Sequence, residues 1–169
     1  MLELLLIVSI LIVDQVAKYL TELFIPFGTS VPLIDGVFQL SNVHNTGAAW
    51  GILAGKQWLF LALTPIFCVL LVLLLVKKRA RIGTLGRICI ALLIAGACGN
   101  LIDRAILSYV RDMFDFCLIR FPVFNVADCA ITIGAALLLV DTLFVKEKSI
   151  FNALEPEKRQ TGSEAHTDE

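Results

Sequence analysis

Four long apolar runs along the sequence restrict this chain to folds that suit a lipid bilayer. They cover approximately residues 2–20, 58–76, 85–102 and 124–145. A transmembrane helix needs about twenty predominantly apolar residues, because each residue advances the helix by about 1.5 Å and the hydrocarbon core is about 30 Å thick. The sequence therefore predicts an all-α membrane protein with four transmembrane helices.

The composition agrees with a membrane protein and argues against a nucleic-acid partner. Of the 169 residues, 58% are hydrophobic and only 17% are charged, which departs strongly from a soluble domain. The formal net charge of -1 lacks the basic excess that binds a phosphate backbone. The five cysteines show no C-x-x-C spacing, so we interpret them as packing residues.

Basic residues in the connections predict the orientation of the helices, because short loops rich in Lys and Arg stay in the cytoplasm. The connection between the second and third runs carries such a cluster, and further lysines follow the fourth run: Lys77, Lys78, Arg79, Arg81, Lys146 and Lys148. Both termini are therefore predicted to be cytoplasmic. Residues 21–57 and 104–122 then face the outside.

The connection between the first two helices has the pattern of a small sheet. Residues 30–33 and 36–43 are rich in Val, Phe and Leu between Pro and Gly residues, as short strands are. We expect an extracytoplasmic β-containing segment here, within a single membrane-embedded domain over residues 1–150. Residues 151–169 are polar and are predicted to form a disordered cytoplasmic tail.

Charged residues inside the predicted helices are costly, so each requires a partner or a function. Asp14 and Lys18 are four residues apart and can pair on one side of the first helix. A structural ion pair and a direct catalytic part both remain open for them. Near the end of the third run, Asn100, Asp103 and Arg104 share one helix face, which fits either a polar site or an Asp–Arg pair at the lipid–water boundary.

Two aspartates lie close to the start of the fourth helix. Asp112 is in the connection before it, and Asp128 follows Asn125 by three residues. The predicted topology places both carboxylates, together with Arg104, near the outer membrane face. Two carboxylates in a partly desolvated site tend to share one proton, so one can activate a water while the other protonates the scissile carbonyl. This is aspartyl-protease chemistry, which requires no metal and no cofactor.

Two other classes of protein fit some of the same residues. In a small transporter or channel, charged side chains would line a path across the membrane: Asp14, Lys18, Asp103, Arg104 and Asp128. The second run offers such a path no charged residue. In a metal-dependent enzyme, carboxylates near the outer face would bind Mg²⁺ or Ca²⁺: Asp112, Asp115 and Asp128. Sensitivity to a chelator distinguishes that enzyme from a carboxylate dyad.

With these motifs in view, the sequence resembles the lipoprotein signal peptidase family, also called signal peptidase II. The matching motifs occur in the family's order and extend over residues 2–145: Asp14-Gln15-Val16-Ala17-Lys18, Asn45-Thr46-Gly47-Ala48-Ala49, Gly99-Asn100-Leu101-Ile102-Asp103-Arg104, Val110-Arg111-Asp112 and Phe124-Asn125-Val126-Ala127-Asp128.

The resemblance implies an aspartic endopeptidase of the bacterial inner membrane with Asp112 and Asp128 as its catalytic dyad. It also implies support of the fold by Asp14 and Lys18. The implied substrates are bacterial prolipoproteins, cleaved before the cysteine that carries diacylglycerol, and the other implied ligands are membrane lipids and cyclic peptide inhibitors such as globomycin. The substrate pocket is implied to be shaped by Asn45, Asn100, Asp103, Arg104 and Asn125.

Overall fold

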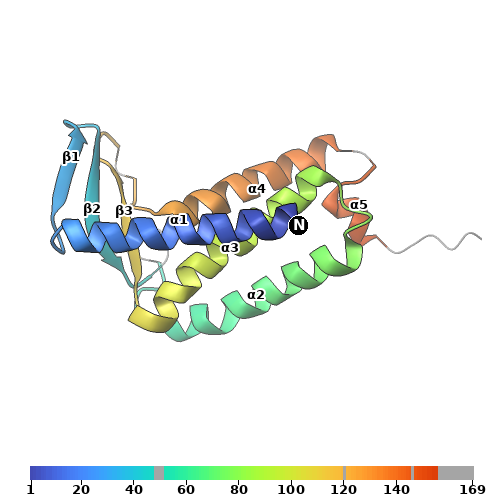
Figure 1. Ribbon diagram of the computed structural model, residues 1–169, viewed down its shortest axis with the longest axis horizontal. Helices are drawn as coiled ribbons and strands as arrows, with labels where there is room; N and C mark the ends of the chain where they lie inside the picture. The colour runs from blue at the N-terminus through green and yellow to red at the C-terminus, as the bar shows by residue number, and fades with distance from the viewer. Residues whose placement is uncertain (48–51, 120, 146, 156–169) are drawn as a thin grey trace, which may run out of the picture.

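The computed structural model describes residues 1–47, 52–119, 121–145 and 147–155. Ala48, Ala49, Lys146 and the tail beyond Glu155 therefore lie outside the described residues. Four long helices form a bundle with a three-stranded sheet at one end (Figure 1). Each helix is long and apolar enough to cross a membrane, which confirms the four predicted spans. The helices are α1 Leu2–Phe24, α2 Gln57–Lys78, α3 Thr84–Leu107 and α4 Val126–Phe144.

The end of α3 differs most from its predicted bounds. The helix continues past residue 102 to Leu107 and ends where Ser108 takes a left-handed backbone conformation with φ 68°. The predicted span ends at residue 102 because the next two residues are charged. In the structure Asp103 and Arg104 remain helical, since their side chains pair with other groups of the protein. An apolar run therefore marks the apolar part of a helix rather than its backbone end.

The core of the bundle lies around α3, which contacts the other three long helices. Two glycines allow a close approach. A Cβ on Gly96 would lie 2.3 Å from the backbone oxygen of Ala127 in α4, and one on Gly99 would lie 2.7 Å from Oδ2 of Asp14 in α1. Because only glycine fits such separations, α1 and α4 both pack directly on the backbone of α3. Asp14 is thereby held beside the start of α4.

The sheet consists of antiparallel strands in the order β1 Ser30–Ile34, β2 Phe38–Asn45 and β3 Val110–Phe116. The first two strands confirm the small sheet expected between α1 and α2. The third strand was not predicted, because it lies in the connection between α3 and α4. Strand β3 pairs with a strand distant in the sequence, and no local pattern reveals that pairing. It places Asp112 opposite Val43 at the sheet end of the bundle.

A short helix, α5 Ile150–Leu154, lies at the opposite end of the bundle (Figure 1). The predicted disordered tail is therefore wrong for residues 151–154. Ile150 and Ala153 are buried in the same apolar cluster as Ile82 of the α2–α3 connection. Oδ2 of Asp141 accepts a hydrogen bond from the backbone N–H of Ile150 at 2.7 Å. Ser149 accepts another from the N–H of Asn152 as the N-cap, so side chains from α4 and the cap define this helix start.

Candidate active site

Asp112 and Asp128 come from different elements but line the same cavity, which has a volume of about 620 Å³. Asp112 lies on β3 and is 3% exposed, and Asp128 lies in the first turn of α4. A bridge between Phe114 and Phe124 pairs β3 with the segment that enters α4. The strand and the helix start are thus held side by side, which brings the two carboxylates to one site.

Asn125, the fully buried N-cap of α4, holds both carboxylates. Its side-chain Nδ2 donates to Oδ1 of Asp112 at 2.7 Å, and its backbone N–H donates to Oδ2 of Asp128 at 3.2 Å. The N–H of Asp128 donates in return to Oδ1 of Asn125 at 2.9 Å, which completes a capping box. The start of α4 and the geometry of the two carboxylates therefore depend on one side chain.

Two further asparagines occupy the remaining carboxylate oxygens. Nδ2 of Asn45 donates to Oδ2 of Asp112 at 2.9 Å, and Nδ2 of Asn100 donates to Oδ1 of Asp128 at 2.7 Å. Oδ1 of Asn100 in turn accepts a hydrogen bond from Nζ of Lys18 at 3.0 Å. Each of the four carboxylate oxygens thus accepts a hydrogen bond. The side-chain amide of Asn100 connects the buried ammonium group of Lys18 to Asp128.

The environment of Asp112 changes its acidity. Burial raises the pKa of Asp112 to about 7 from an ordinary value of 3.8, the hydrogen bond from Asn45 lowers it, and the nearby charge of Asp128 raises it. An exposed aspartate is ionised at neutral pH, whereas Asp112 holds a proton for part of the time. A carboxyl group that titrates near neutral pH can both accept and donate a proton during a reaction.

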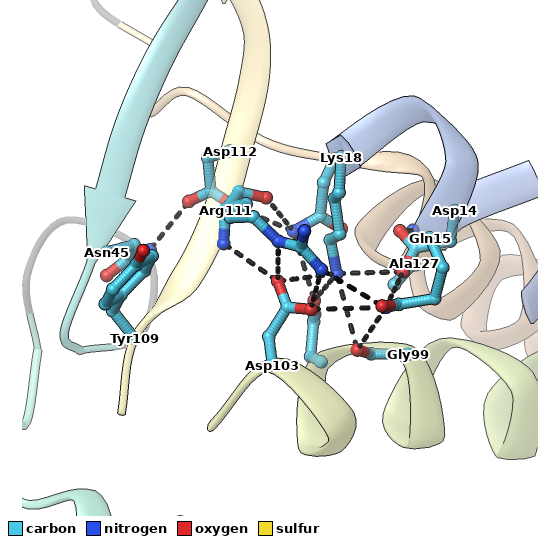
Figure 2. Close-up of polar contacts among 12 residues, drawn as sticks. Asp14, Gln15, Lys18, Asn45, Gly99, Asp103, Tyr109, Arg111, Asp112 and Ala127 are labelled. Atoms are coloured by element: carbon cyan, nitrogen blue, oxygen red, sulfur yellow. Dashed lines mark hydrogen bonds and ion pairs between the residues drawn. The ribbon is translucent and has the colours of Figure 1, made fainter. Parts of the chain in front are cut away.

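A buried ion cluster with Lys18 at its centre lies next to Asp112 (Figure 2), and Lys18 also donates to Asn100, which donates to Asp128. Nζ of Lys18 is 2.8 Å from Oδ2 of Asp14 and 3.4 Å from Oδ2 of Asp103. The predicted pairing of Asp14 with Lys18 is confirmed. Oδ1 of Asp14 also accepts a hydrogen bond from the backbone N–H of Ala127 at 2.8 Å. The cluster thus ties α1 to the first turn of α4, one residue before Asp128.

Asp103 belongs to this cluster and, within the described ranges, does not line the cavity. Its Oδ1 accepts from Nη2 of Arg111 at 2.7 Å, and its Oδ2 accepts from Nε at 3.2 Å and from the backbone N–H at 3.0 Å. Burial lowers the pKa of Arg111, but the hydrogen bonds and charges of Asp103 and Glu22 raise it overall. Asp103 therefore anchors β3 at the residue that precedes Asp112.

Sequence analysis did not identify Arg111 as part of this site. Arg111 also contacts Oε2 of Glu22 at 3.2 Å and Oε1 of Gln15 at 3.0 Å, so it connects β3 with α1 as well as with α3 (Figure 2). Alternation along a strand places neighbouring residues on opposite faces, which separates Arg111 from Asp112. This alternation can be used to assign Arg111 to the opposite face only once β3 is known to be a strand.

Arg104 brings a positive charge to the cavity wall. Its Nη2 donates to the backbone oxygen of Gly47 at 2.8 Å, and its guanidinium lies 4.2 Å from the ring centroid of Phe60. Of the five predicted pocket residues, Asn45, Asn100 and Arg104 line the cavity. Asn125 holds the carboxylates without being part of the lining in the described residues, and Asp103 anchors β3.

Asp115 from the alternative metal site, and three residues of the alternative charged path, are not part of the cavity wall in the described residues. Asp115 accepts hydrogen bonds from Nε2 of Gln39 at 2.6 Å and Oγ of Ser41 at 3.1 Å, so it stays on the sheet. Among the described residues, no three His, Cys, Asp or Glu side chains are grouped to hold a metal ion. Asp14 and Asp103 both contact Lys18 at the sheet end instead of spreading along the bundle.

The rest of the cavity wall is mainly apolar. It is formed by β3, by the segment before α4 and by α4 itself, and it includes Phe116, Phe121, Phe124, Ile131 and Ile133. The polar groups gather where Asp112 and Asp128 meet. Such a site suits a ligand with one polar reacting group and a long apolar part.

Comparisons with known proteins agree with these features. The sequence model of a family described as signal peptidase (SPase) II matches residues 6–144. A lipoprotein signal peptidase of Brevibacillus brevis is 42% identical over 143 residues, which cover 83% of this chain and 93% of that protein. A lipoprotein signal peptidase of Lactiplantibacillus plantarum is 41% identical over 140 residues, again 83% of this chain and 93% of the relative.

Two solved structures have the same fold. Both are described as bacterial membrane enzymes. One has a TM-score of 0.77 and 38% sequence identity, with coverage of 87% of this chain and 93% of its own. The other has a TM-score of 0.74 and 34% identity, with coverage of 85% and 94%.

Proposed function

The chain belongs to the signal peptidase II family, and from that premise we propose that Asp112 and Asp128 form its catalytic dyad. It is an aspartic peptidase of the membrane that removes signal peptides from lipoprotein precursors. The observation that carries the proposal is the convergence of the two carboxylates in one cavity, with Asn125 hydrogen-bonded to both.

The dyad works with a single shared proton. The raised pKa of Asp112 favours this residue as its holder, so ionised Asp128 takes a proton from the attacking water. The water oxygen bonds to the scissile carbonyl carbon while Asp112 gives its proton to the carbonyl oxygen. Collapse of the tetrahedral intermediate breaks the C–N bond, and the leaving nitrogen receives the proton held by Asp128. The proton of the intermediate's hydroxyl returns to Asp112.

The neighbouring residues divide into two groups. Asn45, Asn100 and Arg104 face the substrate or orient the dyad from the cavity wall, and Asn125 orients it from behind. Asp103 supports β3, as Asp14 and Lys18 support the start of α4. The apolar wall accepts the diacylglyceryl chains of the precursor, and the family resemblance implies cleavage before the lipidated cysteine. Membrane lipids and globomycin-type inhibitors are expected to compete for the same wall.

The separation of the two ends of the bundle supports the orientation that we propose. The sheet and the dyad lie at one end, and the α2–α3 connection with Lys77, Lys78, Arg79 and Arg81 lies at the other (Figure 1). The positive-inside rule supports a protein of the bacterial cytoplasmic membrane with both termini in the cytoplasm and the dyad at the outer face. Residues 1–150 then form one membrane-embedded domain.

A cleavage assay on a lipidated precursor tests the dyad. Asp112→Asn and Asp128→Asn keep the side-chain shape and remove the titrating proton, so each is expected to lower kcat by at least about 1,000-fold, and the double variant should be little worse. Asp115→Asn, on the same strand, should cleave at nearly the wild-type rate. Folding is monitored by helical circular dichroism in the same micelles. Substantial turnover by either dyad variant refutes the assignment.

A further inference from the structure

A second cavity, of about 550 Å³, lies at the end of the bundle away from the dyad. It is bounded by the last turn of α2, the α2–α3 connection, the first turn of α3 and the segment after α4. Four basic side chains line it, namely Lys77, Arg79, Arg87 and Lys148. No acidic side chain of the described residues is part of its wall. The catalytic proposal uses none of these groups.

The positive charge of this basic cavity is only partly neutralised. Oε1 of Glu3 lies 3.2 Å from Nη2 of Arg79 and 3.2 Å from Nε of Arg87, so one carboxylate serves two guanidinium groups. Lys77 and Lys148 form no ion pair within the part of the chain that the structure describes. Both are exposed. The site therefore has an excess of positive charge available to an anion.

The cavity has a defined frame. The backbone N–H of Gly83 donates to the backbone oxygen of Lys148 at 2.8 Å, which holds the segment after α4 against the α2–α3 connection. Nη2 of Arg81 donates to the backbone oxygens of Asn152 and Glu155 at 3.0 and 3.1 Å. A Cβ on Gly86 would lie 2.8 Å from Cγ1 of Ile150, so α5 packs closely on the first turn of α3.

The start of α3 adds a backbone contribution. Among the described residues no side chain caps the helix at Gly83, and Thr84 lines the cavity. The first amide groups of a helix and its dipole favour an anion. The basic side chains, Thr84 and the start of α3 thus border the same cavity.

The position of the cavity indicates the source of the anion. Helix α2 ends at Lys78 and α3 begins at Thr84, so the cavity lies where the spans reach the lipid–water boundary. Val76, which is 69% exposed, forms an apolar edge of the same cavity, whereas Ile82 lines it from the buried core. We infer that this cavity binds the phosphate of an anionic phospholipid, whose acyl chains lie along the apolar edge. Inorganic phosphate has the same charged group but lacks the part that contacts Val76.

A bound lipid would add a contact between α2 and the rest of the bundle. In α2, Cys68 is the one buried residue of the described helix, whereas α3 has twelve. The lipid phosphate would join Lys77 at the end of α2 to Arg87 in α3 and to Lys148 after α4. Retention of the lipid should therefore stabilise the folded protein.

Native mass spectrometry of the full chain in micelles doped with phosphatidylglycerol tests the inference. Lys77→Gln combined with Lys148→Gln removes two cations from the cavity and should weaken phosphatidylglycerol retention by about 30-fold. The matched control combines Lys56→Gln with Lys78→Gln, which removes the same charge from residues outside the cavity wall and should retain the lipid as the wild type does. Phosphatidylcholine should be retained weakly by all three proteins.

The thermal unfolding midpoint gives a second measure of lipid binding at the same site. Phosphatidylglycerol should raise it by about 5 °C in the wild type and in the control, but not in the cavity variant. Equal retention by the cavity variant and the wild type would overturn the site. Millimolar inorganic phosphate in phosphatidylcholine micelles should not reproduce the rise, and a rise as large as that from lipid would overturn the assignment to a phospholipid.

Discussion

The two ends of the helical bundle handle charge in opposite ways. At the sheet end, Asp14, Lys18 and Asp103 are at most 1% exposed, and each contacts an opposite charge. At the other end, Lys77 and Lys148 are exposed on the wall of the basic cavity and have no ion-pair partner in the described chain. A buried charge is costly unless it is paired, whereas a charge at the lipid–water boundary stays hydrated or meets a headgroup.

This difference separates two uses of charge in one small membrane protein. The buried cluster acts through geometry, because it connects α1, α3, α4 and β3 around the two carboxylates. The basic cavity acts through net charge, because Arg79 and Arg87 share one carboxylate while Lys77 and Lys148 have no ion-pair partner among the described residues. Substitutions at the sheet end should therefore cost folding energy, while substitutions at the other end should mainly change the affinity for anions.

The largest expected effect comes from Lys18→Met, which leaves Asp14 buried without its cation. The expected loss is roughly 3–5 kcal/mol of unfolding free energy, because one partner of a buried pair remains uncompensated. Lys77→Met at the other end should change that free energy by less than about 0.5 kcal/mol. Denaturant unfolding in micelles measures both. Equal losses in the two variants would contradict the difference between the ends.

A smaller effect is expected from the titration of Asp112. Its folded-state pKa of about 7 lies above the ordinary value of 3.8, so between these values the folded protein holds a proton that the unfolded chain has released. The stability from this group is complete below about pH 4 and is lost as the pH rises through 7. The loss between pH 5 and pH 8 is roughly 3 kcal/mol.

Thermal unfolding at the two pH values checks this expectation. The wild type should lose more stability from pH 5 to pH 8 than Asp112→Asn, which cannot titrate. Asp115→Asn should behave as the wild type does, since it leaves Asp112 unchanged. The proposed mechanism uses the same proton, so kcat/KM should fall as the pH rises above about 7. If the stability of the wild type and of Asp112→Asn changed equally between pH 5 and pH 8, Asp112 would not titrate in this range.

The smallest effect is expected from Glu3→Gln at the basic end. Glu3 pairs with Arg79 and Arg87, whose side chains are 53% and 23% exposed, so solvent screens both pairs and the loss of unfolding free energy should be smaller than that of Lys18→Met. The variant removes the carboxylate beside the basic cavity, so phosphatidylglycerol retention should rise rather than fall. A loss as large as that of Lys18→Met would mean that both ends depend on buried pairing.

Local patterns were sufficient for part of the fold and part of the site. Hydropathy predicted four spans, and the structure has four helices that suit them. The spacing of Asp14 and Lys18 predicted a pair that is 2.8 Å apart. Local patterns failed where a residue's partner is distant in the sequence. Strand β3 and the anchoring contacts of Arg111 were missed for this reason.

The sequence by itself determined the apolar spans, the first two strands and the motifs that identify the family, because each is written in neighbouring residues. Only the tertiary structure decided that Asp103 anchors β3 instead of lining the cavity, and that Lys148 joins Lys77 in a basic cavity. Helical and strand periodicities act over a few residues. The direction in which a polar side chain finds its partner depends on how whole elements pack, and close packing on the backbone of α3 at Gly96 and Gly99 sets that arrangement.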